Sequence, residues 1–317
     1  MTNEQIGALA GLGASLGWLF TSIFFTAAGK RIGPTVVNAL RLVFAVALLG
    51  SMHQIVYGTW WPEGIASQFV FLAMSGLIGL VIGDQLLYTA FVDIGPRLTL
   101  LLMTTTPIFA GLLGLAFLGE TLGLVELLAV GMTIGGVAWV ISERKGTRAD
   151  RAVHKHFVRG VVFALFAAAC QAIGAWLSKQ GMGHGIAGVE EKMDPLSATM
   201  VRMSFALVMI APLMVLHVRR QRRRWRDGES EARVHAGTTL GGIGFTALGA
   251  IAGPFLGVWA SLIAYDRAPL GIAQTMCGLS PVLILPLMPF IYRERLTWRA
   301  VMGAVIAVAG TALFFLV

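Results

Sequence analysis

Long apolar stretches of the sequence contain ionisable side chains, among them Arg41, Asp84 and Arg202. A charge that faces lipid is costly, so each of these side chains should face protein, water or a ligand. At a rise of about 1.5 Å per residue, Arg41 and Asp84 lie at similar depth from the same membrane face, so they can form an ion pair. Such a pair would either fix two helices or serve a substrate or a proton, and the sequence leaves both roles open.

Two prolines interrupt apolar stretches directly after clusters of polar residues. A proline inside a helix frees the carbonyl four residues earlier, here those of Met103 and Cys277. In a membrane a freed carbonyl needs a polar partner, so such kinks either line a site or are closed by back-bonding side chains. The candidate residues at the kinks are Pro107, Pro281, Thr104, Thr105, Gln274 and Thr275.

Aromatic side chains within the apolar stretches are candidates for the wall of a binding site, for packing or for the membrane interface. They are Trp18, Tyr88, Trp176, Trp259 and Tyr265. The six histidines show no spacing of metal ligands, the two cysteines lie in apolar stretches, and no glycine-rich loop is followed by a lysine. The sequence therefore predicts no metal, no cofactor, no catalytic residues and no nucleotide-driven chemistry.

The composition places these residues in a membrane protein. Of 317 residues, 56% are hydrophobic and 13% are charged, against about 45–50% and about 25% in soluble domains. Apolar runs of about 20 residues are long enough to cross a bilayer as helices. The sequence predicts an all-α integral membrane protein with ten transmembrane helices, near residues 6–28, 34–56, 67–92, 96–118, 122–142, 157–180, 195–217, 237–265, 269–292 and 296–317.

The two halves of the sequence repeat each other. An offset of 174 residues aligns four pairs: Gly83 with Gly257, Pro107 with Pro281, Glu120 with Glu294, and Gly136 with Gly310. An offset of 161 aligns Pro34 with Pro195 and Arg41 with Arg202. Each half holds five spans, an odd number, so the second copy should cross the membrane in the opposite sense. We expect a five-helix repeat at 1–142, a basic linker at 143–156 and an inverted five-helix repeat at 157–317.

The symmetry between the halves breaks at Asp84, whose counterpart is Val258. Arg202 therefore lacks the acidic helix partner that its counterpart Arg41 has. Its guanidinium would either hold a carboxylate or phosphate of a substrate by bidentate hydrogen bonds or extend toward the membrane surface.

Two stretches at equivalent places in the halves read Thr106-Pro107 followed by Gly119-Glu120-Thr121-Leu122, and Ser280-Pro281 followed by Arg293-Glu294-Arg295-Leu296-Thr297. They resemble the Ser/Thr-Pro and Gly-Glu-x-Leu-Thr pattern of EamA-type proteins in the drug/metabolite transporter superfamily, and Arg293 departs from the glycine of that pattern. The resemblance implies a ten-helix carrier of small metabolites, often an exporter, with a central cavity lined by both repeats.

These observations predict a secondary transporter, and by resemblance an exporter, that moves small polar or amphipathic metabolites by alternating access. The expected partners are a small-molecule substrate, the lipid bilayer, and a coupling proton or ion if transport is coupled. A membrane-embedded enzyme acting on lipid-linked substrates is an alternative, for which clustered carboxylates or histidines near one interface would be expected. A channel is a further alternative, which saturable flux would exclude. The oligomeric state is not readable from the sequence.

The formal net charge of +8 gathers in loops, so nucleic acid is not expected as a partner. Short loops rich in Lys and Arg stay in the cytoplasm. With ten spans, the loops after the odd-numbered spans and the span ends beside them hold 19 Lys and Arg, whereas the opposite face, counted in the same way with both termini, holds 3. We therefore expect the basic loops in the cytoplasm and both termini outside, in the inner or plasma membrane of the cell. The usual arrangement of the resembled family has both termini in the cytoplasm instead.

Overall fold

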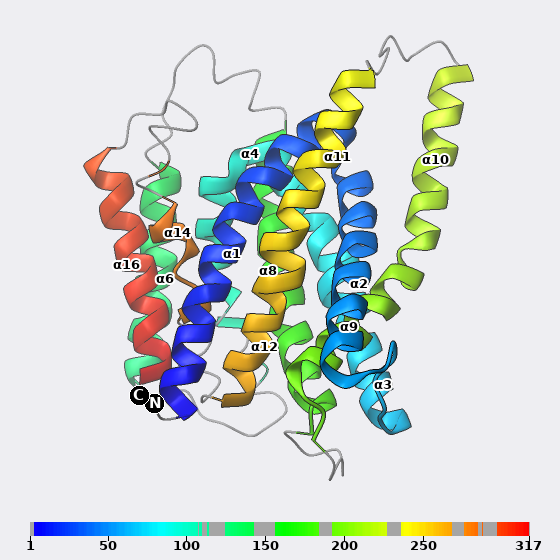
Figure 1. The fold of residues 1–317 in the computed structure, drawn as a ribbon. Helices are drawn as coiled ribbons and strands as arrows, with labels where there is room; N and C mark the ends of the chain where they lie inside the picture. The colour runs from blue at the N-terminus through cyan, green and yellow to red at the C-terminus, as the bar shows by residue number, and fades with distance from the viewer. Residues whose placement is uncertain are drawn as a thin grey trace.

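The computed structural model describes residues 3–106, 108–109, 113, 124–142, 156–183, 192–226, 236–267, 276–284, 287 and 297–316. Among these residues the backbone forms helices and no strand. Long helices stand side by side across the molecule, and the start of the first helix and the end of the last lie at the same end (Figure 1).

The helices follow one another along the chain with short breaks. In order they are α1 (Asn3–Ile32), α2 (Pro34–Tyr57), α3 (Ala66–Ser75), the π-helical segment η1 (Gly76–Gly83), α4 (Asp84–Met103), α6 (Leu124–Ser142), α8 (Phe157–Gly181), α9 (Pro195–Met209), α10 (Ala211–Arg226), α11 (Ala236–Ala250), the π-helical segment η3 (Ile251–Gly257), α12 (Val258–Arg267), α14 (Ser280–Leu283) and α16 (Trp298–Leu316).

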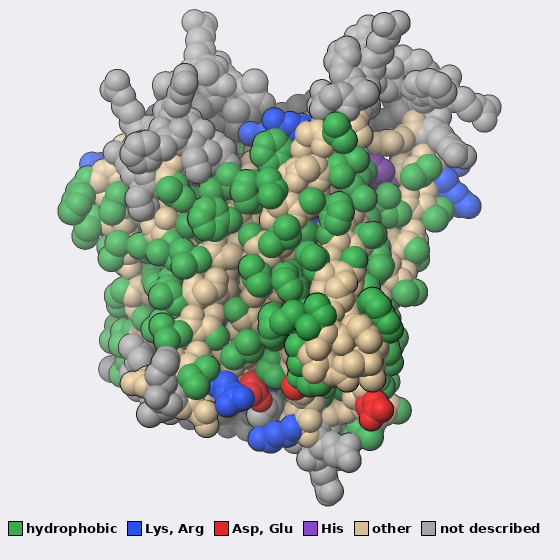
Figure 2. Space-filling model, viewed as in Figure 1, with side chains coloured by type: hydrophobic (Ala, Val, Ile, Leu, Met, Phe, Trp, Pro, Cys, Tyr) green, Lys and Arg blue, Asp and Glu red, His purple; other side chains and the backbone are tan. Residues whose placement is uncertain are grey.

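Within the described part of the chain, six helical stretches are long and apolar enough to cross a membrane: Gln5–Ile32, Pro34–Tyr57, Ala66–Met103, Phe157–Gly181, Pro195–Gln221 and Thr239–Arg267. Large apolar side chains such as Leu9, Phe166, Val208 and Leu240 are exposed on them. Hydrophobic side chains cover the middle of the visible face, and charged side chains gather near its two ends (Figure 2). The protein is therefore a multi-pass membrane protein, as its composition predicts.

The structure describes only parts of the predicted fourth and ninth spans: residues 96–106, 108–109 and 113 of 96–118, and residues 276–284 and 287 of 269–292. Helices α6 and α16 occupy the positions of the predicted fifth and tenth spans. The count of ten spans therefore stays a prediction.

Glycine-proline pairs end one helical stretch and begin the next. Gly33 has a φ of 83° and Pro34 begins α2. Gly95 has a φ of 80° within α4, directly before Pro96, at the junction of the predicted third and fourth spans. Glycine adopts positive φ without steric cost, and proline suits the first helical position, where no N–H partner is needed.

The segments η1 and η3 widen two helices at equivalent places. Each ends on a glycine, Gly83 and Gly257, which stand 174 residues apart. The N–H of Asp84 bonds the carbonyl of Gly79, and the N–H of Val258 bonds that of Gly253, both five residues back. Such wide turns are rare and concentrate at functional positions, because they disturb the regular pairing of the backbone.

A buried apolar cluster lies where α2, η1, α9 and α12 meet, and it includes Leu42, Leu80, Val201 and Leu262. Arg41 lies in α2 and Arg202 in α9, and Asp84 begins α4 directly after η1. Packing of this cluster therefore holds those residues in place.

Helices α6 and α16 touch through glycine. A Cβ atom at Gly136 would lie 2.6 Å from backbone atoms of Gly303 and Ala307, whereas a Cβ at Gly135 would meet nothing within 4 Å. Small residues of this kind let two helices approach closely in a membrane.

We expect Gly136→Ala to push α6 and α16 apart and to lower the free energy of unfolding by about 1–3 kcal/mol. Gly135→Ala is the matched control, and it should be neutral or slightly stabilising because alanine favours helix. Thermal unfolding of the two purified variants in detergent measures the difference. Equal stability of the variants would contradict the close contact.

Candidate functional site

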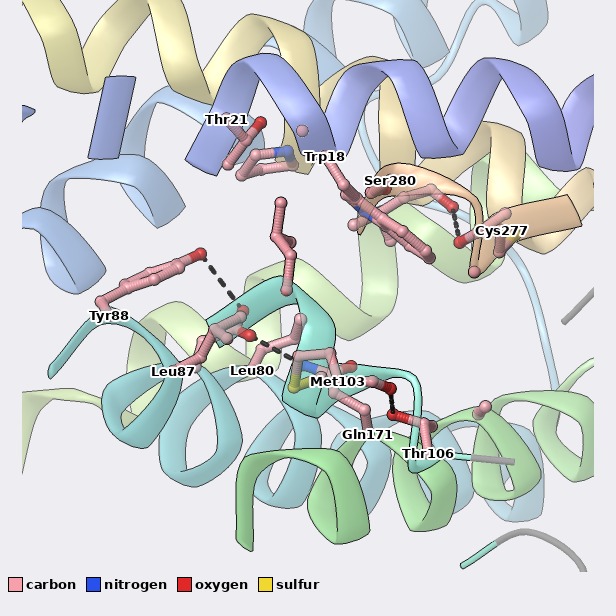
Figure 3. A pocket seen from close by; sticks show the side chains of 18 of the residues that line it. Trp18, Thr21, Leu80, Leu87, Tyr88, Met103, Thr106, Gln171, Cys277 and Ser280 are labelled. Atoms are coloured by element: carbon pink, nitrogen blue, oxygen red, sulfur yellow. Dashed lines mark hydrogen bonds between the residues drawn. The ribbon is translucent and has the colours of Figure 1, made fainter. Parts of the chain in front are cut away.

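A cavity of about 150 Å³ lies between the helices, lined by residues of α1, α2, η1, α4, α8, α9, η3, α12 and α14. Trp18, Thr21 and Ser280 lie on one side of the space, and Leu80, Leu87 and Gln171 on the other (Figure 3). The residues that line this cavity include the three ionisable residues singled out in the sequence, Arg41, Asp84 and Arg202.

Arg41 and Asp84 form the ion pair that the sequence suggested. Arg41 Nη2 lies 2.7 Å from Asp84 Oδ2, and the two side chains are 1% and 7% exposed. Arg41 Nε donates to Asn38 Oδ1 at 3.0 Å. The Arg41 guanidinium also lies over the ring of Tyr88, and its Cζ atom is 5.1 Å from the ring centre. A buried guanidinium needs such a full set of partners to offset the loss of water.

The remaining acceptor capacity of Asp84 is also used. Gln171 Nε2 donates to Oδ1 at 2.7 Å, and the Tyr88 hydroxyl donates to Oδ2 at 3.4 Å. The carboxylate therefore joins α2, α4 and α8 in a single network. Both of its oxygens have partners, which stabilise its charged form.

The wide turn η1 supplies carbonyl groups to the same network. Arg41 Nη2 donates to the carbonyl of Leu80 at 2.8 Å, and Asn38 Nδ2 donates to that of Val81 at 3.2 Å. Gln171 Nε2 also lies 3.3 Å from the carbonyl of Gly79. Side chains of α2 and α8 thus satisfy backbone groups of the π-helical turn, as buried carbonyls require.

Arg202 lies in α9 with 4% of its surface exposed, so it does not extend to the membrane surface. Its Nε has no hydrogen-bond partner among the described residues. No carboxylate of the described chain lies within ion-pair distance of it. The positions that correspond to Asn38, Asp84 and Tyr88 hold Thr199, Val258 and Leu262. The second half therefore repeats the arginine without the partners that neutralise it.

Some of the polar residues near the prolines line the cavity, and others are buried away from it. Thr104, Thr106 and Pro281 line the cavity, and the Thr106 hydroxyl donates to the carbonyl of Met103 at 2.7 Å. This back-bond satisfies the carbonyl that Pro107 was expected to free. Thr105 is buried and bonds the carbonyl of Leu102 instead. Pro107, Gln274 and Thr275 lie outside the described residues.

Of the predicted aromatic residues, Trp18, Tyr88 and Tyr265 line the cavity. Trp259 and Trp176 are not among its lining residues. Trp259 packs near Phe255, with ring centres 6.2 Å apart. The structure therefore brings together Arg41, Asp84, Arg202, Tyr88, Trp18, Thr104 and Pro281, and not the two remaining tryptophans.

Sequence reasoning missed Gln171 and Thr21, which also line the cavity. Gln171 is a polar amide within an apolar stretch, and this contrast in the sequence could have identified it as a candidate site residue. Across the described residues, no group of three His, Cys, Asp or Glu side chains is arranged to hold a metal ion.

The fold and the buried charges define a helical multi-pass membrane protein with a cavity inside the bundle that charged and apolar side chains line. The model of the EamA-like transporter family matches the chain twice, over residues 5–142 and 158–316. The chain belongs to this family, and so to the membrane transporters of the drug/metabolite transporter superfamily.

A comparison with curated proteins found no match. Among solved structures, a crystal structure of a protein superposes with a TM-score of 0.63 at 17% sequence identity, covering 98% of this chain and 96% of the other. At this identity the likeness shows the fold alone.

The two arginines should differ in their effect on stability. We expect Arg41→Met to cost about 3–5 kcal/mol, because it leaves Asp84 buried without its counter-charge. Arg202→Met removes a charge that has no acidic partner in the described chain, so it should cost less than about 1 kcal/mol or stabilise the protein.

Thermal unfolding in detergent measures both changes. The double variant Arg41→Met/Asp84→Leu should recover most of the loss, since an apolar pair replaces the ion pair. If Arg41→Met and Arg202→Met lowered the free energy of unfolding equally, the ion pair with Asp84 would not make Arg41 more important for stability than Arg202.

Proposed function

We propose that the protein is a secondary transporter that exports small polar or amphipathic metabolites by alternating access. The observation that carries the proposal is the cavity, whose charged and aromatic lining comes from both halves of a chain that belongs to a transporter family. Carriers of this kind bind substrate near the middle of the membrane, between related halves of the chain.

Alternating access by an inverted repeat is supported by matching hydrogen bonds in the two halves. Thr21 Oγ1 donates to the carbonyl of Gly249 at 3.1 Å, which joins α1 to α11. Ser75 Oγ donates to the carbonyl of Gly174 at 2.6 Å, which joins α3 to α8. Ser75 and Gly249 are equivalent at the offset of 174, so this position of the repeat is bonded in each case to the first helix of the other half, Gly249 to α1 and Ser75 to α8.

The directions of the helices support the same relation. The end of α1 meets α11 at Gly242, where an added Cβ atom would lie 3.3 Å from Arg31 Cβ. The start of α1 meets the end of α12, where Arg267 bonds Asn3. These helices are therefore antiparallel. Helices α6 and α16 contact each other at Thr133 and Ala307, themselves 174 residues apart, as expected near a twofold axis. We propose the division into 1–142, a linker at 143–156, and 157–317 on this basis.

Counterflow in liposomes tests the transport proposal. Proteoliposomes loaded with unlabelled amino acids, nucleobases or cationic drugs should take up the labelled compound saturably, and faster than empty ones do. Flux that neither saturates nor responds to the inner compound would indicate a channel instead. Loss of a chemical group from the added compound would indicate an enzyme.

Within this assay, Asp84→Asn separates two roles of the carboxylate. If Asp84 serves the substrate or a proton, exchange should fall at least about tenfold while the yield of folded protein stays near that of the wild type. Folded Asp84→Asn protein with normal exchange would leave Asp84 a structural partner of Arg41.

We also propose that the basic loops lie in the cytoplasm and both termini outside. The start of α1 and the end of α16 share one end of the bundle, and α10 carries Arg219, Arg220 and Arg223 toward the other end (Figure 1). Short basic segments are retained in the cytoplasm, which supports this orientation.

A reporter that fluoresces only in the cytoplasm tests the orientation. Fused after Val317, it should stay dark, whereas the same reporter inserted within 143–156 should be bright. Bright cells with the terminal fusion and dark cells with the inserted reporter would reverse the orientation and favour the usual family arrangement.

A further inference from the structure

The described lining of the cavity carries an excess of one positive charge. Two guanidinium groups, Arg41 and Arg202, face a single carboxylate, Asp84. Isolated charges in a low-dielectric interior are unfavourable unless a counter-charge compensates them. One positive charge in the lining of the cavity therefore has no counter-charge among the described residues.

The excess charge belongs to Arg202 rather than to Arg41. Arg41 is bound by Asp84, Asn38 and the carbonyl of Leu80. Arg202 is 4% exposed, lines the same cavity, and has an Nε without a partner in the described chain. A ligand that replaces the missing acid would complete at Arg202 the arrangement that Asp84 completes at Arg41.

We propose that Arg202 binds the carboxylate of a small organic monoanion, which is the substrate class of this transporter. The proposal rests on the transport function above and adds the charge of the substrate. Arg202 would form charge-assisted hydrogen bonds, paired where the geometry allows, with the carboxylate oxygens. The apolar body of the anion would lie against Trp18 and Tyr265, which line the cavity.

The charge balance selects a carboxylate over a phosphate. One carboxylate neutralises the single excess charge, whereas a phosphate monoester carries about −1.5 to −2 at neutral pH and would leave negative charge uncompensated. The balance also disfavours cations, because both oxygens of Asp84 already accept hydrogen bonds from Arg41, Gln171 and Tyr88. An ammonium group would find no free carboxylate among the described lining residues.

The broken symmetry at Val258 provides a selective test. Val258 occupies the position of Asp84 in the second half and lines the cavity. Val258→Asp would place an internal carboxylate where the equivalent position pairs with an arginine at 2.7 Å. Arg202 would then be neutralised from within, and an anion would lose its site. Val258→Asn adds polar volume at the same position without charge, and so it is the matched control.

The probes are matched acids, amides and amines of two sizes: propionate, propionamide and propylamine, and phenylacetate, phenylacetamide and phenethylamine. Dissociation constants are measured on the full chain in detergent from tryptophan fluorescence and from the shift of the thermal midpoint. At least one acid should bind the wild type about tenfold or more tighter than its amide and amine, as expected for a hydrogen bond to a charged group.

Val258→Asp should abolish this preference, and Val258→Asn should keep it whatever its absolute affinity. Arg202→Gln serves as a second variant if Val258→Asp does not fold, and it should also lose the preference. The proposal is overturned if no acid binds tighter than its amide in the wild type, or if the preference survives in folded Val258→Asp or Arg202→Gln protein.

Binding and transport are measured separately, so their failures can be told apart. Acid preference without counterflow of the same acid in liposomes would contradict the transporter proposal and leave Arg202 as an anion site. Counterflow of amides or amines without any acid preference would support transport and contradict the role of Arg202.

Discussion

A carboxylate inside a membrane-spanning bundle must be neutralised and hydrogen-bonded, and the centre of this protein is organised around that requirement at Asp84. Its partners come from α2, α8 and its own helix, through Arg41, Gln171 and Tyr88. Asn38 extends the network to the widened turn before Asp84. Moving any of these helices separately would expose a charge or an unpaired carbonyl to a poorly polar interior. The network therefore fixes three helices relative to one another.

The second half of the chain repeats part of this arrangement without its acid. It retains an arginine, a widened turn and matching contacts between helices, but Val258 and Leu262 replace the acid and the tyrosine. Duplicated halves that remain identical would place equal charges on the two sides of the cavity. Because of the divergence at these positions, Arg41 has an ion-pair partner, whereas Arg202 has no carboxylate within ion-pair distance in the described chain.

The sequence allowed the central features of this site to be predicted because charge is rare in apolar stretches. Arg41, Asp84 and Arg202 stood out, their burial follows from the cost of charge in lipid, and the pairing of Arg41 with Asp84 followed from equal depth. The unequal surroundings of Arg202 followed from Val258 at the position of the missing acid. Family membership was also recognised from the paired proline and glutamate motifs.

Other features could not be predicted for physical reasons. Aromatic residues suit a cavity wall, packing and the membrane interface equally, so Trp18 could not be separated from Trp259 by type alone. The partner role of Gln171 depends on how α8 is rotated against η1, which no local pattern determines. The widened turns at Gly83 and Gly257 were also not recognised, because glycine in an apolar run is equally consistent with close packing.

Those two widened turns have a consequence for the angular phase of the helices. A π-helical turn accommodates one residue beyond the α-helical repeat, and in an α-helix one residue corresponds to a rotation of about 100°. An extra residue in one half alone would have rotated every later side chain away from its counterpart. Because both halves carry the turn at the same place, Asp84 and Val258 keep a common angular phase. Deleting one residue from η1 would accordingly turn Asp84 out of register with Arg41, with no change in the identity of any charged group.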